Sequence, residues 1–194
     1  ITLSKQDTSK NLNVVVFLLE SWTPKYIGAY QNKFKNTTPN FDSLAKNGLL
    51  FTNAFANGDR SIHGITASLL GIHQPIGLPY LGTGLELSNL SKMGDILNKY
   101  GYRTIFAQTS SRGSFRVNSI ADALGFDEYY SQEDFPMIYN YQTDEIPYFG
   151  WDYEAMMFLK DKISENEKPF FSFLFTGTTH EAYILADKKF EIAK

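Results

Sequence analysis

Near its N-terminus the chain reads Asn13-Val-Val-Val-Phe-Leu-Leu-Glu20, a β-branched apolar run that ends in an acid. A short run of this composition is typical of a buried strand in a parallel sheet. A second such run, Pro169-Phe-Phe-Ser-Phe-Leu-Phe-Thr176, lies toward the other end of the chain. We therefore expect two buried strands, the first of them central in its sheet, with Glu20 at its carboxyl end.

Helical and strand patterns alternate between these two runs. Helix starts and apolar residues at helical spacing predict helices over 38–45 with a stop at Gly48, and over 61–70, 90–100, 118–124 and 151–164. Residues 103–108 are expected to form a strand, and 49–56 a strand or extended segment. The alternation predicts an α/β fold with a mostly parallel central sheet flanked by helices.

The composition narrows the class of protein. The 194 residues carry 18 Lys and Arg against 21 Asp and Glu, a net charge of −3, which argues against nucleic acid as a partner. Hydrophobic residues make up 43% of the chain, enough for a sizeable core. The absence of cysteine excludes disulfides, thiolate zinc sites and a cysteine nucleophile.

Three segments are candidates for a functional site because ligands of parallel sheets bind at the carboxyl ends of the strands. They are Glu20–Trp22, Asn57–Gly64 and Thr176–His180. A carboxylate such as Glu20 at the end of a buried strand needs a hydrogen bond, an ion pair or a cation. Ser61 lies at the start of a predicted helix, where it could be either the N-cap residue or a nucleophile that attacks an anionic group bound at the helix N-terminus. Position alone leaves these alternatives open.

Several motifs resemble one known family. They are Thr38-Pro-Asn-Phe-Asp-Ser-Leu-Ala-Lys-Asn-Gly48, Phe51-Thr-Asn-Ala-Phe55, Gly58-Asp-Arg-Ser-Ile-His-Gly64 and Thr178-Thr-His-Glu-Ala-Tyr183. Together with Glu20 they are similar to the sulfatase-like branch of the alkaline phosphatase superfamily, and within it to the phosphoglycerol transferases, which include lipoteichoic acid synthases. The turn at Ser61 lacks the Pro and Arg that follow the modified residue of true sulfatases, and it has Ser where the transferases usually have Thr.

The resemblance implies roles for individual residues. Ser61 would be the nucleophile and, with Glu20, a ligand of a divalent metal, Mn²⁺ by preference, with Mg²⁺ or Zn²⁺ as alternatives. Arg60 and His180 would contact the phosphate. Phe115 matches an aromatic residue of the headgroup site, whereas Arg116 is offset by one position from the family's arginine. His63 and His73 receive no role.

Trp151-Asp152 resembles a shortened Trp–Gly–x–x–Asp element of the group, with ordinary helix initiation as the alternative.

The resemblance also implies a reaction. The protein would transfer a phosphoglycerol-type group from a phospholipid headgroup to a glycan or polymer acceptor through a phospho-Ser intermediate, on the extracytoplasmic face of a bacterial membrane. Alternatives are a phosphoethanolamine transferase and a phosphodiesterase or sulfatase-like hydrolase. A different class of function is a catalytically dead relative that binds glycan or lipid through the Tyr-rich stretch between Glu128 and Gly150.

The metal site of the superfamily also needs an adjacent Asp-His pair, and the chain contains none. We therefore expect residues 13–194 to form the N-terminal part of a larger catalytic domain. Residues 1–12 are expected to be a linker from a membrane region that tethers the protein. On this basis the 194 residues alone are predicted to be inactive.

Overall fold

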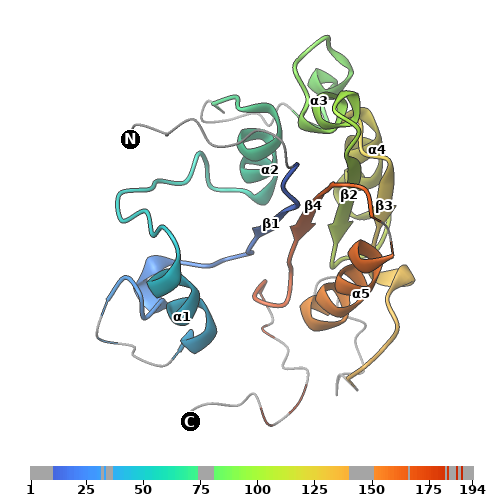
Figure 1. Cartoon of the computed structure of the whole chain (residues 1–194). Helices are drawn as coiled ribbons and strands as arrows, with labels where there is room; N and C mark the ends of the chain where they lie inside the picture. Colours follow the sequence, from blue (N-terminus) through green and yellow to red (C-terminus); the bar gives the residue numbers. More distant parts are fainter. Residues whose placement is uncertain are drawn as a thin grey trace.

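A computed structural model describes residues 11–31, 33, 37–73, 81–139, 151–165, 167–181, 183, 187 and 189. Within these residues four parallel strands form one sheet, as Figure 1 shows. The spatial order is β1 (Val14–Leu18), β4 (Phe170–Phe175), β2 (Arg103–Gln108) and β3 (Glu128–Tyr130). The expected α/β fold with a parallel sheet is thereby confirmed.

Helices pack on both faces of the sheet. One face is covered by α2 (Ser61–Leu70), α3 (Met93–Lys99) and α4 (Val117–Ala123), whose apolar residues pack on a core that includes Phe106 and Phe173. The other face is covered by α5 (Asp152–Ser164). The remaining helix, α1 (Pro39–Asn47), lies apart from the sheet beyond the carboxyl end of β1 (Figure 1). This arrangement leaves the carboxyl ends of β1 and β4 next to the start of α2.

Three details differ from the sequence-based expectations. The first strand is not central: within the described residues β1 pairs only with β4, and its Phe17 is 48% exposed. Of the strand and the extended segment expected for residues 49–56, the strand is wrong, because this segment pairs with no strand among the described residues. The stretch from Glu128, for which no helix or strand was predicted, begins with β3, whose three residues pair with β2. All three differences depend on whether a strand finds a partner that is distant in the sequence. Local composition does not reveal such pairing.

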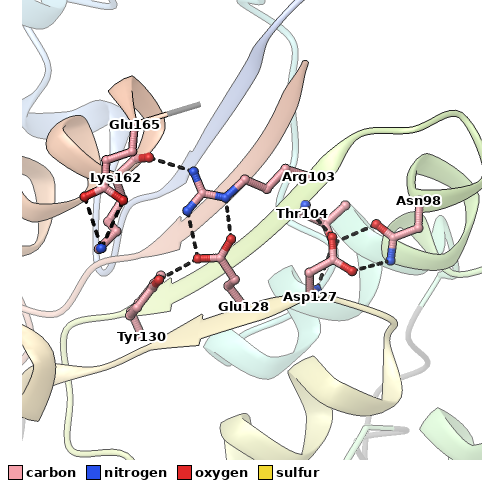
Figure 2. Close-up of polar contacts among 8 residues, drawn as sticks. All are labelled: Asn98, Arg103, Thr104, Asp127, Glu128, Tyr130, Lys162 and Glu165. Carbon is pink, nitrogen blue, oxygen red and sulfur yellow. Dashed lines mark hydrogen bonds and ion pairs between the residues drawn. The ribbon is translucent and has the colours of Figure 1, made fainter. Parts of the chain in front are cut away.

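A polar cluster fastens the amino ends of β2 and β3 (Figure 2). Arg103 of β2 donates to both carboxylate oxygens of Glu128 in β3 and, at 2.7 Å, to the carbonyl of Lys162 in α5. Tyr130 also donates to Glu128. The hydrogen bond with Arg103 lowers the pKa of Glu128, and the same bond raises the pKa of Arg103. One guanidinium therefore joins two strands to a helix at the end of the sheet opposite Glu20.

Replacing Arg103 should destabilise the fold. The side chains of Arg103 and Glu128 are 14% and 26% exposed, so Arg103→Met leaves a poorly solvated carboxylate without its cation. We expect the free energy of unfolding to fall by about 2–3 kcal/mol, measured by urea denaturation. Lys160→Met is the matched control, because the Lys160–Asp161 pair is 66% and 73% exposed and should contribute less than about 0.5 kcal/mol. Equal effects of the two variants would contradict the expectation.

Candidate active site

A pocket of about 640 Å³ opens where β1 and β4 end and α2 begins. It brings together residues from segments that are far apart in the chain. The residues that line it are Glu20, Asp59, Arg60, Ser61, Ile62, Ile65, Leu81, Gly82, Phe115, Arg116, Val117, Phe175 and His180. Every residue predicted for the site lines this pocket. The structure therefore brings the predicted residues together, and their chemical roles stay predictions.

Glu20 and Ser61 are in direct contact across the pocket wall. The Ser61 hydroxyl donates to Glu20 Oε2 at 2.5 Å, although the two residues are 41 positions apart. The other carboxylate oxygen accepts from the Ser21 hydroxyl at 3.0 Å. Ser21 has a positive φ of 54°, so the chain turns sharply just after β1. The hydrogen-bonded alternative for Glu20 is therefore seen in the structure, and its role as a metal ligand stays a prediction.

Ser61 is the first residue of α2, and Arg60 occupies the N-cap position with extended backbone angles. The N-cap role for Ser61 was one of two alternatives from the sequence, and it is wrong because the hydroxyl points to Glu20 and caps no amide of the helix. The first turn of a helix presents unpaired N–H groups and a partial positive charge. An anionic group that approaches Ser61 would meet both.

Two arginines border the pocket. Arg60 and Arg116 are exposed, and within the part of the chain that the structure describes neither forms an ion pair. Arg116 and its neighbour Phe115 both have positive φ values, of 57° and 52°. Such angles are unfavourable for residues other than glycine, and strained residues of this kind cluster at active sites and ligand-binding turns. The turn holds Phe115 at the pocket with 73% of its surface exposed.

His180 reaches the pocket from the loop after β4. Its backbone N–H donates to the Gly177 carbonyl at 2.9 Å, which curls the chain back toward the sheet. In the same loop Thr176 accepts from the Glu20 N–H at 3.0 Å, and Thr179 donates to the Glu20 carbonyl. The predicted phosphate contact therefore lies on a loop that is hydrogen-bonded to Glu20.

Some pocket residues escaped the sequence analysis. Asp59 precedes Arg60 in the same motif and could have been singled out, whereas Leu81 and Gly82 belong to no motif. His63, left without a role, is 3% exposed and lies 3.3 Å from an oxygen of Asp59. Its ring fills the space where a Cβ at Gly58 would lie, only 2.3 Å from Nδ1. His63 thus packs beneath the turn that leads to Ser61.

The residues present suit part of a divalent metal site. Glu20 and Ser61 offer a carboxylate and a hydroxyl oxygen side by side, and hard divalent cations prefer such oxygen ligands. Among the residues that can be described, no group of three or more His, Cys, Asp or Glu side chains could hold an ion. The pair therefore fits two positions of a coordination shell.

The described residues include no helix that is both long and apolar enough to cross a membrane. The expected linker over 1–12 lies almost wholly outside the described residues, as does the Tyr-rich stretch from 140 to 150.

Solved structures with a similar fold come from several bacteria. An alkaline phosphatase superfamily protein from Vibrio parahaemolyticus has a TM-score of 0.73 and 24% identity, with 90% of this chain and 42% of that chain covered. The lipoteichoic acid synthase LtaP from Listeria monocytogenes gives 0.72 and 20%, covering 91% and 43%. The C-terminal periplasmic domain of EptC from Escherichia coli, solved in complex with Zn, gives 0.64 and 16%, covering 97% and 51%.

These neighbours agree with the fold, and the chain spans about half or less of the length of each. A sequence profile of the family described as Sulfatase matches residues 12–191, which is nearly the whole chain. The expected resemblance is thereby confirmed at the level of the family and its superfamily. The chain belongs to the sulfatase family.

Proposed function

We propose that this protein is a metal-dependent phosphotransferase that moves a phosphoglycerol-type group from a lipid headgroup to a glycan or polymer acceptor. The observation that carries the proposal is the Ser61 hydroxyl, which lies at the first turn of α2, bonded to Glu20, in a pocket bordered by two arginines. A nucleophilic oxygen beside cationic groups is the arrangement that phosphoryl transfer needs.

The reaction has two balanced halves. Ser61 Oγ attacks the phosphorus of the donor, a P–Oγ bond forms, and the bond to the lipid alcohol breaks. Ser61 loses its hydroxyl proton, which is the proton hydrogen-bonded to Glu20 Oε2 in the structure. The departing lipid alcohol takes up one proton. In the second half the acceptor oxygen attacks the phosphorus of the phosphoserine, a new O–P bond forms and the P–Oγ bond breaks. The acceptor hydroxyl loses one proton and Ser61 Oγ regains one.

Arg60, Arg116 and His180 line the same pocket as Ser61, and in this proposal they would contact the non-bridging oxygens. Guanidinium groups bind phosphate oxygens by paired, charge-assisted hydrogen bonds, so the two arginines would hold the donor while Ser61 reacts. Glu20 and Ser61 would bind the divalent ion, Mn²⁺ by preference. When bound, the ion would supply positive charge that favours the ionised hydroxyl.

The apolar wall of the pocket fits a donor with an apolar part. Ile65 and Leu81 are almost fully buried, and Phe115 stands exposed beside them. A lipid alcohol would keep apolar surface away from water along this wall. We further propose that the enzyme acts outside the cytoplasm, as a domain tethered to a membrane, a setting supported by the similar periplasmic domain of EptC.

The test uses the protein expressed from its whole reading frame, with Mn²⁺ and three separate substrates: phosphatidylglycerol, phosphatidylethanolamine and an aryl sulfate. Release of diacylglycerol from phosphatidylglycerol, with glycerol phosphate attached to Ser61, is the expected result. A preference for phosphatidylethanolamine would mean that the transferred group is phosphoethanolamine and not phosphoglycerol. Free glycerol phosphate without an acceptor product would make the protein a hydrolase. Sulfate release alone, or lipid binding without turnover, would overturn the proposal.

A further inference from the structure

Asp152, the first residue of α5, has unusual partners for an acid at a helix start. Such an acid ordinarily interacts with the amides of its own first turn or with water. The Asp152 carboxylate accepts instead from the Gly177 amide at 2.7 Å and from the Thr178 amide at 3.1 Å. In return, the Asp152 N–H donates to the Thr178 hydroxyl at 3.2 Å. Helix initiation alone does not explain this reciprocal arrangement.

The segment that Asp152 holds is the β4 loop, residues 176–180. This loop is the one that contacts Glu20 from two sides, through the Thr176 and Thr179 hydroxyls. Thr176 also donates its N–H to the Leu18 carbonyl at 3.1 Å, which extends the pairing of β1 with β4 by one residue. A continuous set of hydrogen bonds therefore runs from α5 through the β4 loop to the end of β1.

The environment of Asp152 favours a carboxylate held in one place by the protein over one that faces solvent. Burial raises the pKa of its carboxyl, and the hydrogen bonds from the Gly177 and Thr178 amides act in the opposite direction. Asp152 is not among the residues that line the pocket. The carboxylate is therefore placed to act on the pocket only through the loop that it binds.

We propose that Asp152 is a positioning residue that sets the β4 loop and, through it, the places of His180 and the Glu20 backbone. The proposal rests on the proposed function for its catalytic consequence, and on the hydrogen bonds alone for its structural part. A shift of about 1 Å in catalytic groups is enough to lower a rate by about a hundredfold. The position of the β4 loop therefore matters for turnover.

The first arm of the test measures amide hydrogen exchange in Asp152→Ala and Asp152→Asn, in the protein expressed from its whole reading frame. In Asp152→Ala we expect faster exchange at Gly177, at Thr178 and also at Glu20, whose amide is bonded to Thr176. Asp152→Asn keeps a carbonyl acceptor but loses the charge, so exchange at these amides should rise less than in Asp152→Ala while staying faster than in the control. Asp161→Ala is the matched control, since Asp161 lies on the same helix with its side chain 73% exposed.

The second arm measures kcat for the lipid substrate in a double-mutant cycle. We expect Asp152→Ala to lower kcat by about 10–100-fold but to have little further effect in an His180→Ala background, because both changes act on one group. A loss of stability alone would give the same factor in both backgrounds.

The two arms separate the two proposals. An inactive wild-type protein would refute the proposed function, and the exchange measurement would still decide whether Asp152 holds the loop. Unchanged exchange at Glu20 in both Asp152 variants would overturn the inference, as would fully additive losses of kcat. Unfolding of Asp152→Ala would shift the decision to Asp152→Asn, whose exchange at Thr178 and Glu20 must then exceed that of Asp161→Ala.

Discussion

Ser61→Ala is expected to abolish turnover, with kcat lowered by at least about a thousandfold. The change removes the only hydroxyl that contacts Glu20 Oε2 within the described residues, and with it the atom that would form the P–O bond. Phospholipid binding should survive, because the arginines and the apolar wall of the pocket are untouched. The measurement is diacylglycerol release together with mass spectrometry of the intact protein for a phosphorylated intermediate.

Two further variants complete this experiment. Ser68→Ala makes the same chemical change on the exposed side of the same helix and should leave kcat unchanged. Ser61→Thr keeps a hydroxyl at the first turn of α2 and should retain measurable activity. Turnover by Ser61→Ala at the wild-type rate would remove Ser61 as the nucleophile.

Glu20→Ala is expected to weaken Mn²⁺ binding by at least about a hundredfold and to reduce turnover in proportion. Within the described residues the Glu20 carboxylate is the charged oxygen group that is hydrogen-bonded to Ser61, and in the proposed site it would be a metal ligand. Its loss also leaves the Ser61 hydroxyl without its acceptor, so the proposed nucleophile is no longer held in one position. Isothermal titration with Mn²⁺ and a parallel lipid assay measure the two effects.

Glu167→Ala is the control for charge, since Glu167 is exposed just before the amino end of β4, whereas the pocket lies at the carboxyl end of that strand. Its Mn²⁺ affinity should match that of the wild type. If Glu20→Ala bound Mn²⁺ as tightly as Glu167→Ala, Glu20 would not be a ligand, and its hydrogen bond with Ser61 would be its whole role.

Much of the fold could be predicted because its signals are local. The aromatic run of β4 and the spacing of α2 both identify their elements from a few neighbouring residues. The edge position of β1 and the existence of β3 could not be predicted this way. Each depends on which strand lies alongside, and β3 is only three residues long and begins with an acid.

The candidate site shows the same division. Ser61 and Glu20 could be nominated because a motif or the end of a strand marks them. The partners of Asp152 could not be predicted, since its hydrogen bonds reach across 25 and 26 positions to the β4 loop. Contacts of this kind depend on tertiary packing and leave no trace in local periodicity.

The hydrogen bond between Glu20 and Thr176 joins residues that are 156 positions apart. During synthesis β1 leaves the ribosome long before β4, its only described partner in the sheet, and must remain unpaired in the meantime. Parallel pairing between such distant segments closes a long loop and slows folding. The pocket can therefore form only after β4 has been synthesised and has paired with β1, so that a nascent chain that stops before β4 contains Ser61 but not this pocket.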